Sequence, residues 1–220
     1  MNRDQINYYS ERAKEYEQIY QKEERQEDLK QLEIILKDIF FAKSVIEIAC
    51  GTGYWTQVIS ETAKSIFAVD INDTVLEIAQ SKKYKAPTTF EKADIFNLTN
   101  VNQEFDSGFG GFIWSHIPKK DLDVFLSGFI SMISPGGLVV FVDNQYVEGS
   151  NTLIDSEDDY GNTYQIRKLS NGSSYKVMKN FPVDKEILEI IEPIGTDIEI
   201  KQLQYFWVLK FNVKKGVQRK

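Results

Sequence analysis

The segment from Glu47 to Thr56 combines an acid, two glycines and the start of a helical pattern, and it reads EIACGTGYWT. Apolar residues before the glycines predict a buried strand, and those after them recur at helical spacing. Gly51 and Gly53 let a ligand approach the backbone more closely than a Cβ atom would allow, or let the chain adopt positive φ. The segment therefore predicts a turn that holds a small cofactor at the carboxyl end of a strand.

The spacing within this turn separates two kinds of cofactor. A dinucleotide turn has a third small residue three positions after the second glycine, whereas this chain has Thr56 there. Glu47 lies within the strand, where its carboxylate would repel a pyrophosphate and attract a cation. The pattern favours a ligand with sulfonium and ammonium groups over NAD, and an NAD-dependent oxidoreductase remains an alternative.

Two further acids follow at the ends of later strands. Asp70 follows Glu47 by 23 residues (70 minus 47), and Asp94 follows Asp70 by 24 residues (94 minus 70). A carboxylate at a strand end can accept both hydroxyls of a ribose, which is the role that we expect for Asp70. Asp94 would accept from an adenine amine, with Ile71 and Ile95 on the two faces of the ring. These positions describe an aminoacyl, ribosyl and adenyl ligand along one edge of a sheet.

With these positions in place, the sequence resembles the class I S-adenosylmethionine-dependent methyltransferases of the small-molecule bacterial type. The resemblance spans roughly residues 40 to 142, and Ala49 departs from the glycine that many members carry there. It implies S-adenosylmethionine as cofactor, S-adenosylhomocysteine as product, no metal, and in-line methyl transfer to a small-molecule acceptor. The matching segments are Glu47-x-Ala49-x-Gly51-x-Gly53, Asp70, Ala93-Asp94-Ile95, Phe105 to Pro118, and Ser134-Pro135-Gly136-Gly137.

The resemblance also implies a set of cofactor contacts. Similar enzymes fold an N-terminal helix over the cofactor, so Tyr8, Tyr9 and Tyr16 are candidates to face the pocket; the alternative is an aromatic stripe packed on the sheet. Cys50 is interpreted as a packed small residue of the turn, not a nucleophile, because it has no evident base nearby. The predicted cofactor contacts are Tyr8, Tyr16, Glu47, Ala49, Cys50, Gly51, Gly53, Trp55, Asp70, Ile71, Ala93, Asp94, Ile95, Trp114 and Ser115.

The residues on the acceptor side form no such motif. His116, the only histidine, follows the fourth predicted strand, where this family brings cofactor and acceptor together. We interpret it either as a general base or as a residue that orders its loop through a backbone hydrogen bond. Arg167 can hold an acceptor carboxylate or phosphate, and Tyr146 is the second predicted acceptor contact. The alternative for the segment around them is a hairpin that covers a sheet edge and faces solvent.

The elements that must position these residues alternate between strand and helix patterns. This order predicts an α/β, Rossmann-like, doubly wound sheet of seven mostly parallel strands with an antiparallel last strand. We expect one methyltransferase domain over residues 1–220, with an N-terminal helical cap over 1–40 and a β-hairpin insertion over 143–183. The predicted strands are 45–49, 65–70, 88–91, 105–114, 138–142, 198–203 and 205–213, and the hairpin strands are 163–169 and 174–178.

The composition of the chain limits the kinds of partner that it is expected to bind. The net charge of −7 opposes nucleic acid binding, and no apolar run is long enough to cross a membrane. The start of the chain lacks the apolar core of a secretory signal, and a lone cysteine makes no internal disulfide, so we expect a cytoplasmic protein that is a monomer or homodimer. Two functional alternatives stay open: methylation of a protein, and non-catalytic binding of S-adenosylmethionine.

Overall fold

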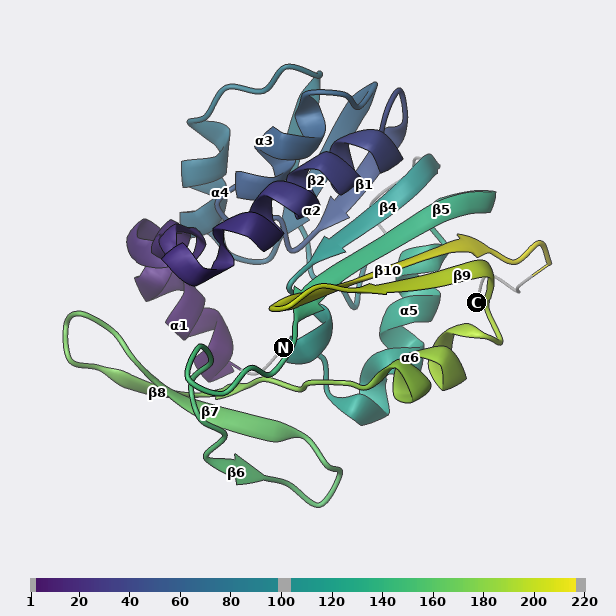
Figure 1. Cartoon of the computed structure of the whole chain (residues 1–220). Helices are drawn as coiled ribbons and strands as arrows, with labels where there is room; N and C mark the ends of the chain where they lie inside the picture. The colour runs from purple at the N-terminus through teal and green to yellow at the C-terminus, as the bar shows by residue number, and fades with distance from the viewer. Residues whose placement is uncertain (1–2, 99–103, 217–220) are drawn as a thin grey trace.

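A seven-stranded sheet lies at the centre of the computed structural model, which describes residues 3–98 and 104–216 (Figure 1). The strand order is β3-β2-β1-β4-β5-β10-β9. Strands β1 to β5 are parallel to their neighbours, whereas β10 is antiparallel to both β5 and β9. The predicted α/β, Rossmann-like fold is confirmed. The strands are β1 Ser44–Ile48, β2 Ser65–Asp70, β3 Thr88–Lys92, β4 Phe105–Gly111, β5 Ile133–Asn144, β9 Gly195–Gln202 and β10 Phe206–Val213.

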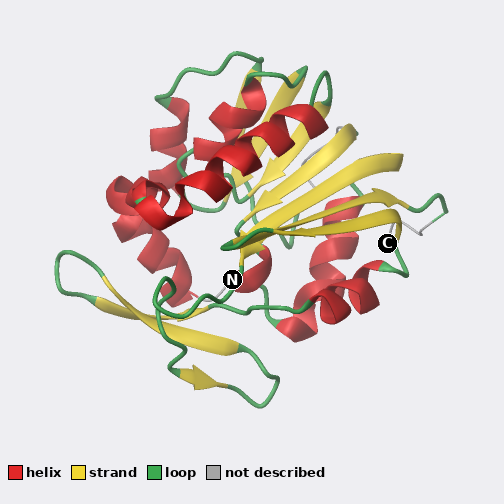
Figure 2. Ribbon diagram, viewed as in Figure 1, coloured by secondary structure: helices red, strands yellow, loops and turns green. Residues whose placement is uncertain are grey.

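Helices cover both faces of this sheet (Figure 2). Val45 and Ile46 are adjacent in β1 but pack into different core clusters, because side chains alternate along a strand. One cluster includes side chains of α2, α3 and α4, and the other includes side chains of α5 and α6. The helices are α1 Arg3–Arg12, α2 Gln26–Ile39, α3 Tyr54–Ser60, α4 Asp73–Gln80, α5 Leu122–Ile130 and α6 Asp184–Ile191, and the 3-10 segments are η1 Ala13–Gln21, η2 Glu23–Arg25, η3 Trp114–His116 and η4 Lys119–Asp121.

The N-terminal segment contains two α-helices, α1 and α2, joined by 3-10 segments. The first α-helix ends at Arg12, and the chain continues as the 3-10 segment η1. Aromatic contacts hold η1 against α3: Tyr20 stacks on Tyr54 at 4.1 Å between ring centroids and accepts a hydrogen bond from Trp55 Nε1 at 3.0 Å. The cap therefore approaches the glycine turn through η1.

The insertion forms a small antiparallel sheet beside α1 (Figure 1). The predicted hairpin is present as β7 Thr163–Lys168 and β8 Ser174–Met178. A third strand, β6 Ser156–Glu157, was not predicted, since two residues are too few to give an alternating pattern. At the hairpin turn, Asn171 accepts from the Ser173 backbone N–H, and Gly172 has φ +87°. The structure thus places this sheet and α1 side by side.

One predicted strand boundary was wrong. Strand β5 begins at Ile133 and not at residue 138, so the Pro135-Gly136-Gly137 turn is an irregularity inside the strand, where pairing with β4 shifts register. Helix α6 begins at Asp184, and the Glu186 carboxylate accepts from the Val183 backbone N–H at 3.0 Å. No helix in the described part of the chain is long and apolar enough to span a membrane.

Candidate active site

The glycine turn lies between β1 and α3, as predicted. Gly51 has φ +55° and Gly53 has φ +79°, and a Cβ atom on Gly53 would collide with the Tyr84 hydroxyl. A Cβ atom on Gly51 would meet no atom within 4 Å, so this side of the turn is open to a ligand. Ala49 also has positive φ, +51°, which explains physically why glycine suits this position.

Asp70 connects the end of β2 to this turn. Its Oδ2 accepts from the Gly51 backbone N–H at 2.9 Å, and its Oδ1 accepts from the Asn72 backbone N–H at 2.9 Å. Burial raises the pKa of Asp70. Each carboxylate oxygen has a second acceptor site, so Asp70 can hold the turn and still accept from a ribose.

Glu47 is buried beneath the turn, and its environment suits a cationic ligand. Its Oε2 has no hydrogen-bond partner within the described residues, and burial raises the pKa of Glu47 to about 8. A buried polar atom without a hydrogen-bond partner lowers the stability of the fold, and a bound ammonium group would supply the missing partner. Glu47 lines a small cavity with Gly51 and Trp55, so the residues present fit the aminoacyl part of S-adenosylmethionine.

A second small cavity, of about 70 Å³, lies against the glycine turn and is covered by the cap. Ile71 and Asp70 line its sheet side, and Ile6, Tyr9 and Tyr16 line its cap side. Ligand cavities for small molecules are usually about 300–1,000 Å³, so the cap side chains occupy much of the space that a cofactor would need.

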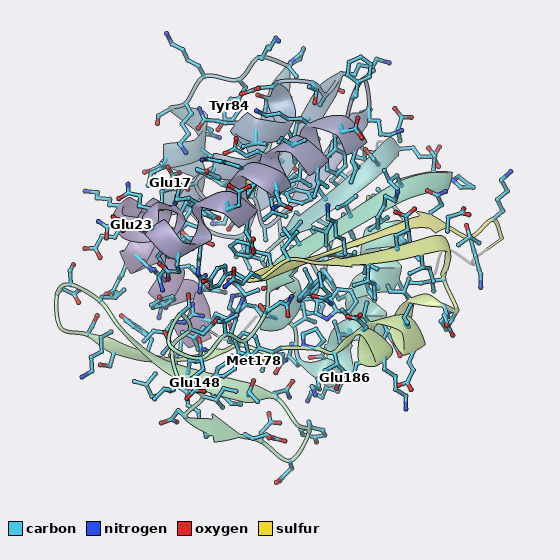
Figure 3. The ribbon with its side chains drawn as sticks, in the orientation of Figure 1. Glu17, Glu23, Tyr84, Glu148, Met178 and Glu186 are labelled. Carbon is cyan, nitrogen blue, oxygen red and sulfur yellow. The ribbon has the colours of Figure 1, made fainter. Side chains whose placement is uncertain are left out.

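The cap also contacts the turn directly through Glu17. Its Oε1 accepts from the Thr52 hydroxyl at 2.6 Å and pairs with Lys82. Glu17 lies on η1, on the same side of the molecule as Tyr84 (Figure 3). The N-terminal segment is therefore bonded to the residue between the two glycines.

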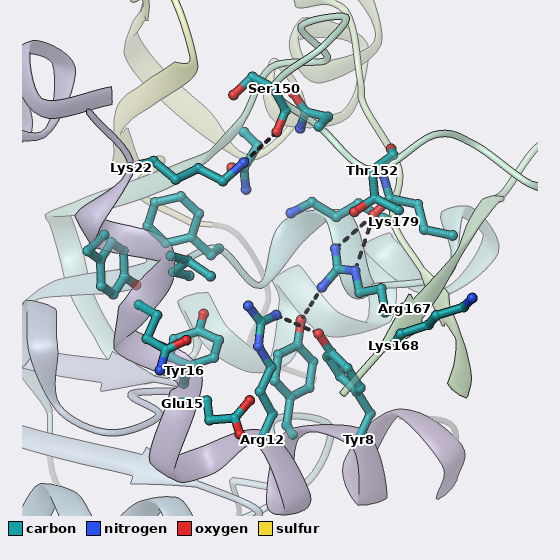
Figure 4. Close-up of a pocket in the computed structure, with 18 of the residues that line it drawn as sticks. Tyr8, Arg12, Glu15, Tyr16, Lys22, Ser150, Thr152, Arg167, Lys168 and Lys179 are labelled. Atoms are coloured by element: carbon teal, nitrogen blue, oxygen red, sulfur yellow. Dashed lines mark hydrogen bonds between the residues drawn. The ribbon is translucent and has the colours of Figure 1, made fainter. Parts of the chain in front are cut away.

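A larger cavity of about 550 Å³ lies between the cap, the insertion and the end of β5 (Figure 4). Arg167 of β7 lines it, together with Tyr8 and Arg12 of α1. Both this cavity and the one at the glycine turn are lined by Tyr9, Tyr16, Phe112 and His116. The two cavities therefore meet at these four residues.

Comparison with known proteins identifies the family. The family described as "Methyltransferase domain" matches residues 45–137. An uncharacterized methyltransferase of Oceanobacillus iheyensis is 22% identical over 168 residues, which cover 75% of each chain. A structure of DhpI in complex with SAM and HEP is 25% identical, with a TM-score of 0.79, and the match covers 94% of this chain and 95% of DhpI. Together these likenesses support a class I S-adenosylmethionine-dependent methyltransferase.

A further relative matches this methyltransferase over a shorter length, and a second DhpI structure matches it over nearly the whole chain. An uncharacterized methyltransferase of Anoxybacillus flavithermus is 22% identical over 103 residues, 47% of this chain. The chain spans about half the length of that relative, 48%. A structure of DhpI with SAH has a TM-score of 0.78 at 24% identity and covers 96% of both chains.

His116 of the methyltransferase follows β4 and lies at the junction of the two cavities. Its Nδ1 is 2.6 Å from the carbonyl oxygen of Met178, the last residue of β8 (Figure 3). Because a carbonyl only accepts, Nδ1 carries the proton, and Nε2 accepts from the Tyr9 hydroxyl at 2.7 Å. Burial and then the charges of Lys179 and Arg167 hold the pKa of His116 well below its usual value, so the ring is neutral.

A buried ion pair joins the two ends of the insertion. Lys179, after β8, lies 2.7 Å from Asp143 in β5 and donates to the Ser115 hydroxyl at 2.6 Å. Asp143 also accepts from the Ser115 backbone N–H at 2.9 Å. This network holds η3, and with it His116, against the base of the insertion.

Several predicted contacts lie away from these cavities. Asp94 accepts from the Phe96 backbone N–H at 3.0 Å, Ile95 is buried in the core, and Trp114 packs against Phe141 and Trp207. Tyr146 packs edge-on against Phe181. The roles predicted for these residues stay predictions. The predicted residues that line none of the three cavities described are Gly53, Ala93, Asp94, Ile95, Trp114, Ser115 and Tyr146.

Other predicted residues do line them. Cys50 and Trp55 line the small cavity beside Glu47, and burial raises the pKa of the Cys50 thiol well above its usual value. That thiol is protonated and packed, as the sequence suggested. No sequence pattern indicated that Arg12 and Arg25 line a cavity, because charged residues between apolar positions of a helix usually face solvent. No cluster of three or more metal-ligating side chains occurs in residues 3–98 and 104–216.

Proposed function

We propose that this methyltransferase transfers a methyl group from S-adenosylmethionine to a small-molecule acceptor. The observation that carries the proposal is the junction at Tyr9, Tyr16 and His116, where the cavity at the glycine turn meets the larger one. In-line displacement requires donor and acceptor to be aligned in contact, and two cavities that share a wall provide such an arrangement. The DhpI complex with SAM and HEP supports a cofactor site in this fold.

The residues of the turn would hold the cofactor. S-adenosylmethionine supplies an electrophilic methyl group on a sulfonium when it is bound. Gly51 allows the backbone to approach the ligand, Asp70 accepts from the ribose, and Glu47 provides negative charge for the aminoacyl end. Ile71 supplies an apolar wall beside Asp70.

The cap and the insertion favour a small acceptor over a protein. Tyr8 and Arg12 from α1, and Arg167 from β7, enclose the larger cavity, which leaves little room for a folded protein surface at the junction. At the junction both ring nitrogens of His116 are engaged, because Nδ1 donates to Met178 and Nε2 accepts from the Tyr9 hydroxyl. A general base whose pKa is far below neutral is weak, so we assign His116 chiefly to orienting Tyr9, which lines both cavities.

Binding and transfer experiments test this function separately. Calorimetric titration with S-adenosylmethionine, S-adenosylhomocysteine and NAD should show binding of the first two only. Asp70→Asn should weaken that binding, whereas Asp73→Asn, an exposed neighbour in α4, should not. Incubation with isotope-labelled methyl donor and a cell-extract metabolite pool should give a labelled small molecule. Cofactor binding without any labelled product would support a non-catalytic binding protein, and label in protein would overturn the small-molecule acceptor.

The cellular location, metal requirement and oligomeric state of the enzyme are also proposals. We infer a cytoplasmic enzyme from the single cysteine, which cannot form an internal disulfide. We also infer that transfer requires no metal, because carboxylates and backbone groups of the turn suffice to position a sulfonium donor. The active species would be a monomer or a homodimer, and light scattering at assay concentrations would decide between them.

A further inference from the structure

The larger cavity is cationic in a chain that is acidic overall. The net charge of the chain is −7, yet only one acidic residue, Glu15, lines this cavity. Cationic side chains are therefore concentrated at this cavity, although acidic residues outnumber basic ones in the chain as a whole. They are Arg12, Lys22, Arg25, Arg167, Lys168 and Lys179.

Four of these six cations, Arg12, Arg25, Arg167 and Lys168, form no ion pair within the described residues, and the two arginines that line the middle of the cavity are Arg12 and Arg167. Arg12 donates to the Tyr8 hydroxyl, and Arg167 donates to Gln165 Oε1 at 2.9 Å and to the Tyr9 hydroxyl at 3.4 Å. No carboxylate in residues 3–98 and 104–216 lies within 4.0 Å of either guanidinium. By contrast, Lys179 in the same cavity is paired with Asp143.

The two guanidiniums also contact the same aromatic ring. Arg12 lies 5.6 Å and Arg167 lies 5.7 Å from the centre of the Tyr8 ring. Figure 4 shows the guanidinium groups of Arg12 and Arg167 pointing into the same space from α1 and β7, whereas Lys22 donates to the Ser150 carbonyl at 2.7 Å. Like charges that line one cavity repel, and an anion between them would convert that repulsion into attraction.

This cationic region reaches the junction where transfer would occur. The Tyr9 hydroxyl that Arg167 contacts also donates to His116 Nε2. An anion bound at Arg167 would thus lie one side chain away from the residues shared with the cofactor cavity. Arg guanidinium groups bind carboxylate and phosphoryl oxygens in pairs, which fixes orientation as well as position.

We infer that the acceptor carries an oxyanion headgroup, a carboxylate or a phosphoryl group, and that Arg12 and Arg167 bind it in the larger cavity. This inference rests on the proposed function, because it names the class of acceptor for the same site. The headgroup fixes the acceptor with its methylated atom toward Tyr9 and His116. The cap and the insertion each contribute one of the two guanidiniums, so both segments are needed to bind it.

The test measures anion binding to the full-length protein loaded with S-adenosylhomocysteine. Inorganic phosphate and acetate are titrated by calorimetry at constant ionic strength, with chloride as the background anion. At least one probe should bind, and Arg167→Gln and Arg12→Gln should each weaken its binding by about tenfold or more. Lys176→Gln removes the same charge from an exposed site on β8 outside the cavity and should leave binding unchanged. The stronger probe identifies the headgroup as phosphoryl or carboxylate.

A purely structural role for the arginines predicts a different pattern. In that case Arg167→Gln would lower the melting temperature while anion binding stayed as in the unmodified protein. Arg167→Lys, which keeps the charge but loses the paired donors, should bind the anion with intermediate strength if our inference holds. Absence of phosphate and acetate binding, or equal loss in Lys176→Gln, would overturn it. If S-adenosylhomocysteine itself fails to bind, the proposed function falls instead.

Discussion

Replacement of Lys179 by methionine should strongly destabilise this methyltransferase. The Lys179 and Asp143 side chains are 4% and 0% exposed, so the substitution would leave a carboxylate buried without its cation. Loss of one partner of a buried ion pair costs about 3–5 kcal/mol. Asp143 would keep donors from the Ser115 and Asn144 backbones, so we expect the lower end, about 3 kcal/mol at pH 7. For a chain of this size that corresponds to a fall in melting temperature of roughly 6–12 °C.

The loss should depend on pH in a defined direction. In the unmodified protein, burial opposes ionisation of Asp143, but the Lys179 charge holds the pKa of Asp143 below its usual value. Without that charge, burial raises the folded-state pKa above the unfolded one. The variant is then penalised at high pH and recovers as pH falls, because the buried carboxyl takes up a proton. The difference in unfolding free energy between the unmodified protein and the Lys179→Met variant should therefore decrease from pH 8 to pH 5 by up to about 1.4 kcal/mol per pH unit.

Urea unfolding of four proteins at several pH values measures this effect. Lys176→Met removes an exposed lysine and should cost less than about 0.5 kcal/mol. The double variant Asp143→Asn with Lys179→Met should be more stable than Lys179→Met alone, because no unpaired charge remains. The reasoning fails if the Lys179→Met gap is constant with pH, or if the double variant is no more stable.

Three other substitutions test the cofactor side and the junction. Glu47→Gln should stabilise the cofactor-free protein at pH 7.5 by roughly 1–3 kcal/mol, because burial raises the folded-state pKa of Glu47 to about 8 and the protein loses stability as pH rises toward that value. Urea unfolding should show this gain in unfolding free energy at pH 7.5 and not at pH 5. Titration should show that the same variant binds S-adenosylmethionine more weakly. Ala49→Gly should raise stability by about 0.5–1 kcal/mol because it relieves positive φ, and a lower melting temperature would contradict this. His116→Gln should not change how the turnover rate depends on pH between pH 6 and 8, because His116 is neutral throughout that range in the unmodified enzyme. If the unmodified enzyme shows an inflexion near pH 6.5 and the variant does not, His116 titrates during turnover.

The sheet and the glycine turn were predictable because their signals are local. The strand before Gly51, the turn itself and the helix after Gly53 occupy one short segment, and hydrophobic periodicity reports each of them. Asp70 was predictable for the same reason, since it ends a strand next to that turn. The fold and the cofactor side could therefore be predicted from residue type and spacing.

On the acceptor side His116 and Arg167 were candidates, but the arrangement around them could not be predicted, because it is assembled from distant parts of the chain. Arg12 and Arg167 meet over Tyr8 only after α1 packs on β8, and no local pattern predicts that contact. The tautomer of His116 likewise depends on the carbonyl of Met178, in another element. The residues Ala93 to Ile95 were assigned from a motif match, and although the side chain of Ile95 fills the core, their cofactor role stays a prediction.

The division between sheet and appended segments has a consequence for how such enzymes diversify. The segment that matches the family, residues 45–137, contains the glycine turn and Asp70, whereas Arg12, Arg167 and Lys179 all lie outside it. A relative can therefore keep the donor machinery intact and exchange its cap or insertion for others. The Lys179 and Asp143 pair would act as the fastening point for such an exchange, since it closes the insertion onto the sheet. Acceptor preference would then evolve as a replaceable module, and likeness within residues 45–137 would carry no information about it.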